Sequence, residues 1–370
     1  MQTITLEEIY APIEASIEKV PAALIEVLGT SNALASEVIQ YFFSGKGKLL
    51  RPALTLLGAA LKQPVYSAQI HPPLHGGKDS HVHAAVGGVS FSPLLGGKDS
   101  DVYAAVGGIS FPPLVRLSAS YEIFHAATLI HDDIIDSAYL RRNLPTINVK
   151  WGAPTAVLVG DYLHDKALEV IHTEGSREVF SLFLKTAAEV CDGEIHELSQ
   201  NKNFGLTEEE YFEIIRKKTA VLLACALESG ARYAGCSTEE AAALSRFGHA
   251  FGMAFQIVDD CLDFTGNEHE FGKTLGADLE AGVLTLPLIR LLACSGASVR
   301  AEIQAVFESG DAGRLRALLE KIRGAKTLDY AFEKARQFSA EARQALQPFP
   351  ASPAKHSLEK LLDYVLERQR

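Results

Sequence analysis

Residues 126–136 read AATLIHDDIID and residues 255–264 read FQIVDDCLDF, and both stretches contain the pattern Asp-Asp-x-x-Asp. On a helix the first and last aspartates lie one turn apart on one face, where like charges destabilise the helix unless a cation joins them. The apolar neighbours argue against an ordinary solvated charge run. Mg²⁺ takes one or two protein carboxylates together with waters and substrate phosphates. Two such clusters facing each other would therefore hold a diphosphate through bridging metal ions.

Apolar residues recur at three- and four-residue spacings over most of the chain, and strand alternation is almost absent. Thr207 and Ser237 each precede acidic residues and are expected helix N-caps. The pattern predicts an all-α fold, one large helical bundle that forms a single domain over residues 1–370. The expected helices are 7–28, 115–135, 153–172, 178–198, 208–234, 239–264 and 299–323.

A Gly- and Pro-rich insertion at about 63–114 interrupts the helical pattern. Within it residues 72–91 and 92–111 form a tandem repeat, identical at fifteen of twenty positions. Two copies are too few for a solenoid. The segment is either a binding or regulatory loop or a duplicated surface insertion, and the second interpretation is favoured because surface loops tolerate insertions.

The overall charge of the chain disfavours some partners. The formal net charge is −11 and the pI is about 5.6, which argues against a nucleic-acid partner. Five cysteines without a C-x-x-C pair indicate a reducing compartment. We expect a cytoplasmic protein, because no signal peptide and no apolar run long enough for a transmembrane segment is apparent.

Basic and polar residues near the acidic motifs could bind an anionic substrate. His125 lies two helical turns before Asp132, on the same side of the expected helix, and Thr219 and Gln256 could face the same cavity. Taken one at a time, each of these residues is more typical of a wet surface, a helix end or core packing. The basic residues are Lys48, Arg51, Arg141, Arg142, Lys218 and Lys273.

Together these motifs resemble those of the trans (E)-polyprenyl diphosphate synthases, the family of farnesyl, geranylgeranyl and longer-chain synthases. Asn143 and Lys46 stand where the family has glycine, and the insertion is a further departure. The resemblance implies the all-α isoprenoid synthase fold. The matching segments are GKLLRP (47–52), HDDIID (131–136), RRNLPTINVKWG (141–152), GDYL (160–163), KTA (218–220), FQIVDDCLDF (255–264), GKTLGADLEAG (272–282) and TLPL (285–288).

The resemblance also implies a role for each matching residue. Thr219 and Gln256 would stabilise an allylic cation through their oxygens. Two or three Mg²⁺ ions would be held by Asp132, Asp136 and Asp259, supported by Asp133, Asp260 and Asp263. Isopentenyl diphosphate would be bound by Lys48, Arg51, His125 and Arg142. The allylic diphosphate would be bound by Arg141, Lys218 and Lys273.

The implied reaction is head-to-tail (1′–4) condensation of isopentenyl diphosphate with an allylic diphosphate. Metal ions and cations neutralise the charge on the departing diphosphate, so that an allylic carbocation forms, and proton loss ends the cycle. No protein general base is required. The resemblance further implies a homodimer, and leaves open a transient membrane contact for product release.

Product length is expected to depend on residues upstream of the first motif, where the family grows its chain down a tunnel. Ala127 and Thr128 are small, which argues against a short product. Phe124 and Tyr121 lie deeper, with each helical turn adding about 5.4 Å. We predict a hexaprenyl to decaprenyl product, with octaprenyl favoured as the precursor of a quinone side chain.

Two other functions are compatible with an Asp-rich helical site. A terpene cyclase of the same fold also ionises an allylic diphosphate, but it has no need for the second substrate's basic residues. A catalytically silent partner subunit of a heteromeric synthase usually loses aspartates, whereas all six are present here.

Overall fold

The structure, a computed structural model, describes residues 4–45, 47–62, 111–265, 281–309, 312–323 and 326–368. Helices dominate these residues, and the strands found among them are one antiparallel pair, β1 (Leu140–Arg141) and β2 (Leu144–Pro145). The expected all-α bundle is confirmed. No helix of the described part is long and apolar enough to cross a membrane.

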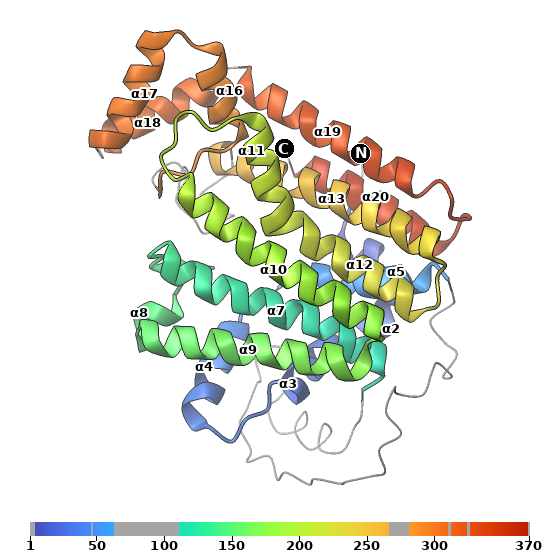
Figure 1. Ribbon diagram of the computed structural model, residues 1–370. Helices are drawn as coiled ribbons and strands as arrows, with labels where there is room; N and C mark the ends of the chain where they lie inside the picture. The colour runs from blue at the N-terminus through green and yellow to red at the C-terminus, as the bar shows by residue number, and fades with distance from the viewer. Residues whose placement is uncertain are drawn as a thin grey trace.

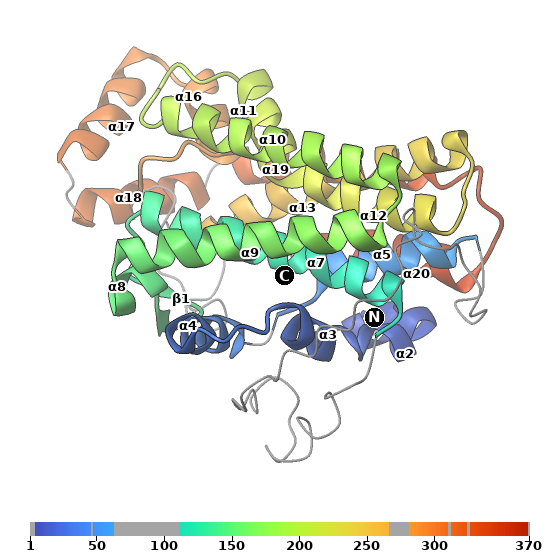
Figure 2. The ribbon, with the colours of Figure 1, turned by 60° about the horizontal axis from the view of Figure 1, so that its bottom comes forward.

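The centre of the bundle is a set of long helices that run side by side (Figures 1 and 2). In both views α7 lies against α9, and α12 lies between α5 and α13, while α19 packs on the outer side of α13. The bounds are α5 (Leu50–Ala60), α7 (Pro113–Ile135), α8 (Ile147–Trp151), α9 (Ala153–Glu174), α10 (Arg177–Ser199), α12 (Val221–Tyr233), α13 (Thr238–Thr265) and α19 (Thr327–Ala345).

Close helix crossings depend on glycine. A Cβ atom on Gly230 of α12 would lie 1.8 Å from the backbone oxygen of Thr55 on α5, and one on Gly252 of α13 would lie 2.5 Å from the Cα atom of Ala220. Neither distance is possible for a real side chain, so both crossings need glycine. Gly230 therefore lets α12 pack closely on α5, and Gly252 lets α13, which carries the second acidic motif, pack closely on the π turn η3 (Arg216–Ala220).

The expected helix over residues 7–28 is wrong in detail. The structure has α1 (Leu6–Tyr10), the 3₁₀ turn η1 (Ala11–Ile13), α2 (Glu14–Ile17) and α3 (Val20–Val27), followed by α4 (Ala33–Phe43). Pro12 and Pro21 explain the breaks, because proline has no N–H and clashes with the preceding turn.

Two other expected helices are also divided. The segment 208–234 is α11 (Glu208–Ile215), a π turn η3 (Arg216–Ala220) and α12, and the segment 299–323 is α17 (Ala297–Ser309) and α18 (Ala312–Arg323). Gly310, a poor helix former, lies in the sequence between α17 and α18. The expected caps are confirmed, since Thr207 and Ser237 each accept a hydrogen bond from the residue three positions later. The remaining helices are α16 (Leu286–Cys294) and α20 (Pro353–Glu367).

The insertion expected at 63–114 ends earlier than predicted, because α7 begins at Pro113. Proline is favoured at the first helical position, where its missing N–H costs nothing. Phe111 is buried against the core. The rest of the insertion and of the tandem repeat 72–111 lies outside the described residues.

Candidate active site

The first acidic motif lies at the C-terminal end of α7. Asp132 is in the last turn, and Asp136 is the C-cap, whose backbone N–H donates to the carbonyl oxygen of Asp132 at 2.8 Å. Carboxylates are unfavourable here, because the helix dipole already places partial negative charge at this end. The location therefore increases the need for a nearby cation.

Two glutamates that the sequence reasoning missed lie beside the first motif. Glu194 and Glu197 project from α10, and both pair with Nζ of Lys218, which Glu194 Oε2 contacts at 2.9 Å. Burial raises the pKa of Asp132 to about 7, the charge of Glu194 adds to this, and Lys218 opposes it. Four carboxylates, counting Asp136, thus surround one lysine. In the sequence, Glu194 and Glu197 are only two acidic residues three positions apart on one helix face, a pattern that is common on solvated helices and does not single them out.

Asp133, the middle aspartate of the first motif, is bound by Arg141. Its carboxylate is buried and accepts hydrogen bonds from Nε of Arg141 at 2.9 Å to both oxygens, with Nη2 of Arg141 at 2.8 Å. A bidentate guanidinium–carboxylate pair is among the strong interactions of its kind. Asp133 and Arg141 are therefore engaged with each other.

A two-residue turn positions the paired arginines. Arg142 and Asn143 connect β1 to β2, and both have positive φ, 52° and 62°. This is the requirement of a type I′ hairpin turn, which asparagine tolerates well and arginine does not. Asn143 can therefore take the position at which the family has glycine. The positive φ strains the backbone at Arg142, and backbone strain of this kind is most common at functional sites.

The second acidic motif lies on α13 and has a different surrounding. Asp260 is buried, and its oxygens accept hydrogen bonds from the hydroxyl of Tyr211 at 2.6 Å and from Nε2 of Gln256 at 2.7 Å. Gln256 Oε1 in turn accepts from Oγ1 of Thr219 at 2.7 Å. Thr219 belongs to the π turn η3, a feature often found at functional sites. Thr219, Gln256 and Asp260 therefore form one hydrogen-bonded chain.

Asp259 and Asp263 occupy the more accessible side of α13. Asp259 is half exposed and pairs with Nη2 of Arg368 at 3.1 Å, while Asp263 is half-buried one turn further along. The guanidinium of Arg368 also lies 5.5 Å from the ring centroid of Phe255. Arg368 follows α20, so a residue from the end of the described chain contacts the second motif. The sequence reasoning missed it.

The predicted isopentenyl diphosphate residues lie near one another. Arg51 is in the first turn of α5, and Arg142 donates from Nη1 to the carbonyl oxygen of Gly45 at 3.3 Å. Burial lowers the pKa of His125, and the charge of Arg51 lowers it further, so the site favours the neutral form of His125. Leu49, between Lys48 and Arg51, has a φ of 49°, a second strained position. Lys273 lies outside the described residues.

The predicted chain-length residues line the buried side of α7. Ala127 is buried, and Thr128 donates from its hydroxyl to the carbonyl oxygen of His125 at 2.9 Å. Phe124 and Tyr121 are fully buried, and their rings contact Phe183 of α10 at centroid distances of 4.9 and 5.9 Å. Tyr121 also donates to the hydroxyl of Ser229 on α12 at 2.5 Å. Phe183 and Ser229 were not predicted.

The acidic residues fit a metal that also binds substrate. In the part of the chain that the structure describes, no three His, Cys, Asp or Glu side chains converge closely enough to hold a metal ion by themselves. Mg²⁺ keeps several waters and commonly needs only one or two carboxylates together with phosphate oxygens. The carboxylates around Lys218 are ligands of the type that Mg²⁺ prefers, and the single charge of the lysine does not neutralise all of them.

Comparison with known families decides the identity. A family model described as polyprenyl synthetase matches residues 101–322, which include both acidic motifs, the hairpin and the π turn. The chain belongs to the polyprenyl synthetase family. As a polyprenyl synthetase it is a prenyltransferase that condenses prenyl diphosphates.

Individual relatives agree with this assignment. Heptaprenyl diphosphate synthase component 2 of Geobacillus stearothermophilus is 36% identical over 252 residues, 68% of this chain and 78% of the relative. Octaprenyl diphosphate synthase of Escherichia coli K12 is 28% identical over 369 residues, 99% of this chain and 100% of the relative. A polyprenyl synthase from Caulobacter crescentus CB15, crystallised with calcium and isoprenyl diphosphate, matches with a TM-score of 0.83 and 27% identity, covering 100% of both chains. The names of other relatives range from short-chain to nonaprenyl synthases, so membership of the family does not determine the length of the product.

Proposed function

We propose that this polyprenyl synthetase joins isopentenyl diphosphate head-to-tail (1′–4) to an allylic diphosphate and makes a medium- to long-chain all-trans product, of about C30–C50, with octaprenyl diphosphate favoured. The observation that carries the proposal is the combination of two acidic helix ends with nearby basic residues. The acidic ends belong to α7 and α13. Arg51 and Arg142 both lie close enough to His125 to lower its pKa, and Lys48 interacts with Asp259 of the second motif.

The allylic diphosphate is proposed to bind between the two acidic motifs. Asp132, Asp136 and Asp259 would hold Mg²⁺ there, with the other three aspartates in support. The bound metal supplies charge neutralisation on the departing diphosphate. Lys218 adds a positive charge from the π turn, where it is paired with Glu194 and Glu197. Arg141 is anchored by Asp133, and Lys273 completes the proposed set.

The allylic cation is proposed to be stabilised by the oxygens of Thr219 and Gln256. The hydrogen bond between Oγ1 of Thr219 and Oε1 of Gln256 fixes both side chains on the inner side of α13 and η3. A fixed dipole costs no reorganisation when charge develops, which is why such groups accelerate ionisation. Asp260 accepts a hydrogen bond from Gln256 and another from Tyr211, and so helps to hold the Gln256 side chain in place.

The buried face of α7 supports a long product. Ala127 and Thr128 are small side chains near the first motif, and large aromatic side chains begin deeper along the helix, where Phe124 and Tyr121 contact Phe183. Replacing Ala127 by Tyr should place a ring close to the diphosphate site and shorten the product. Phe124→Ala should lengthen it.

The test is incubation of the purified chain with farnesyl diphosphate, isopentenyl diphosphate and Mg²⁺, followed by sizing of the products. Products of hexaprenyl to decaprenyl length are expected, and Ala127→Tyr should shift them toward geranylgeranyl diphosphate. Products no longer than geranylgeranyl from the unmodified chain would contradict the long-chain part. A cyclic hydrocarbon product would instead favour the terpene cyclase alternative.

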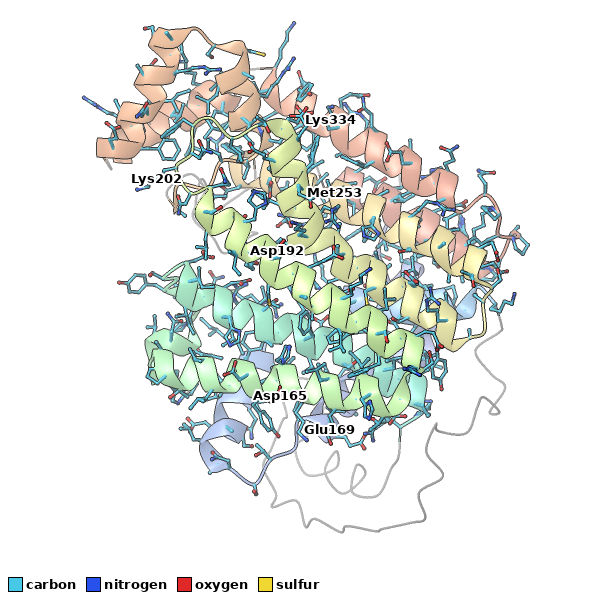
Figure 3. All side chains as sticks on the ribbon, in the orientation of Figure 1. Asp165, Glu169, Asp192, Lys202, Met253 and Lys334 are labelled. Carbon is cyan, nitrogen blue, oxygen red and sulfur yellow. The ribbon has the colours of Figure 1, made fainter. Side chains whose placement is uncertain are left out.

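A homodimer is part of the proposal. Large apolar side chains are exposed on α9 and α10, whose side chains Figure 3 draws; Leu158 is 68% and Ile195 is 65% exposed. Clustered exposed apolar residues commonly mark an interaction surface. Light scattering should give twice the chain mass. An inactive chain that becomes active when a second subunit is added would favour the partner-subunit alternative.

A further inference from the structure

Four polar side chains form a cluster within the apolar core of the bundle. They are Tyr121 on α7, Thr186 on α10, and Cys225 and Ser229 on α12, and all four are buried. The hydroxyl of Tyr121 donates to Oγ of Ser229 at 2.5 Å. The thiol of Cys225 donates to the hydroxyl oxygen of Tyr121 at 3.8 Å and lies 4.0 Å from Oγ of Ser229, and Thr186 is hydrogen-bonded to Cys225. The cluster therefore joins three helices of the core.

The groups of this cluster are neutral. Burial raises the pKa of Tyr121 well above its ordinary value and that of Cys225 to about 11, so both keep their protons at neutral pH. Exchanging a pair of buried polar groups for apolar ones of the same shape costs little stability. Stability alone is therefore a weak reason for two hydroxyls at this depth. What the hydrogen bond adds is a fixed orientation of the Tyr121 ring.

Tyr121 lies where the growing product is proposed to end. It precedes Asp132 by about 16 Å along the helix, and Phe124 lies about one turn nearer to the acidic motif. The rings of Phe124 and Tyr121 both meet Phe183 edge-on, at interplanar angles of 81° and 76°. The two phenylalanine rings have no polar atom, so they can turn without breaking a hydrogen bond. Tyr121 cannot turn without giving up its bond to Ser229, which makes it the anchored ring of the three.

We propose that Ser229 determines product length, because its hydroxyl holds the Tyr121 ring in place as the floor on which the growing chain ends. The inference rests on the proposed function, since it names the residue that fixes the floor of the product site proposed there. Ser229 acts through Tyr121 and is therefore a positioning residue. A floor that depends on ring volume alone would work equally well with phenylalanine at position 121, whereas an anchored floor would not.

The experiment removes one hydroxyl at a time, in Ser229→Ala and Tyr121→Phe. Each variant is incubated with farnesyl diphosphate, isopentenyl diphosphate and Mg²⁺, and the products are sized. Both variants should give a broader distribution whose mean is longer by about one isoprene unit, because a ring that can turn aside opens roughly one helical turn of depth. The double variant should do no more than either single variant, because the two hydroxyls act as a unit.

Ser120→Ala is the matched control. Ser120 is also fully buried and lies next to Tyr121 on α7, but its hydroxyl donates to the carbonyl oxygen of Leu117 at 2.6 Å, within its own helix. The change removes a hydroxyl from the same part of the core and leaves the Tyr121 ring anchored, so product length should not change. Melting temperatures are measured for every variant, since a general loss of stability lowers the yield of product without lengthening it.

Binding of ready-made all-trans polyprenyl diphosphates of graded length tests the floor without turnover. Calorimetric titrations contain Mg²⁺ and no isopentenyl diphosphate. The chain length at which affinity falls should be about one isoprene unit longer in Ser229→Ala and in Tyr121→Phe than in the unmodified chain. If the unmodified chain condenses nothing, the proposed function fails, and this series still decides the role of Ser229.

Three results would overturn the role of Ser229. The first is an unchanged product length and an unchanged binding limit in both variants. The second is a shift in only one of the two variants, since the hydroxyls are proposed to act together. The third is an equal shift in Ser120→Ala, which would trace the effect to a loosened core and not to the anchored ring.

Discussion

The two acidic motifs have the same spacing but different electrostatic surroundings. At the first motif Asp132 lies beside Glu194 and Glu197, and one lysine is shared among the carboxylates. At the second motif Asp259 already has a counter-ion, Arg368. The first motif therefore has the greater need for an added cation. Neighbours from other helices, and not the motif itself, set this difference.

The middle aspartates show the same contrast. Asp133 is held by a guanidinium, whereas Asp260 is held by the neutral groups of Tyr211 and Gln256. Both aspartates are buried. The hydrogen-bonded chain from Asp260 to Thr219 connects the second motif to the proposed cation-stabilising oxygens.

The largest expected effect is that of Asp132→Asn. Condensation should fall by about a thousandfold, equivalent to about 4 kcal/mol, because a proposed metal ligand is lost. The same change should stabilise the metal-free protein by about 1 kcal/mol, since it removes one of several crowded carboxylates. Steady-state kinetics and thermal melting in a chelator measure the two effects.

Asp165→Asn is the control for this prediction. Asp165 is an exposed aspartate on α9, with 80% of its side chain accessible, so neither activity nor melting should change. If Asp132→Asn kept more than a tenth of the activity, the first motif would not be the stronger cation site.

The pH dependence should come mainly from the first motif. The pKa of Asp132 is raised to about 7 in the folded chain from an ordinary value of 3.8, so its protonated form is the one that folding favours. Its contribution to stability is present below about pH 4 and is lost as the pH rises through 7. Melting in a chelator should therefore show lower stability at pH 8 than at pH 6, and Asp132→Asn should remove part of that slope.

Metal binding should depend on pH in the opposite direction. Protons and Mg²⁺ compete for Asp132, so activity at limiting Mg²⁺ should fall up to about tenfold for each pH unit below 7. Saturating Mg²⁺ should move this fall to lower pH. A Mg²⁺ requirement that stays constant between pH 6 and 8 would contradict the account.

A smaller effect is expected at the second motif. Arg368→Ala removes the counter-ion of Asp259, so the Mg²⁺ concentration for half-maximal activity should decrease a few-fold, while stability changes by less than about 1 kcal/mol. Arg343→Ala, which breaks the partly exposed pair with Asp363, is the control and should not alter the Mg²⁺ requirement. A Mg²⁺ requirement that rises in Arg368→Ala would show that the two motifs do not differ as described.

The sequence could predict the elements that local spacing controls. Helical period and caps located most helices, and the positive φ of Asn143 agrees with its tolerance of a left-handed turn. The breaks in the segment 7–28 fall at Pro12 and Pro21, where the loss of a backbone N–H outweighs the helical period of the apolar residues. The π turn at Lys218 left no signal in the sequence, because it depends on packing between η3, α10 and α13.

The partners of the site residues were harder to predict. Glu194 on α10 and Arg368 just after α20 are charged residues of a kind that is usually solvated. Their importance arises from contacts with residues far away in the sequence, such as Arg368 with Asp259, 109 positions apart. Spacing within one helix cannot reveal a contact of this kind.

The most direct test of the central claim is incorporation of labelled isopentenyl diphosphate into farnesyl diphosphate by the unmodified chain, Asp132→Asn and Asp259→Asn, with and without Mg²⁺. The account predicts Mg²⁺-dependent elongation by the unmodified chain, and almost none by either variant, since both acidic motifs hold the same diphosphate. Elongation that persists without divalent metal, or that survives the loss of either aspartate, would contradict it.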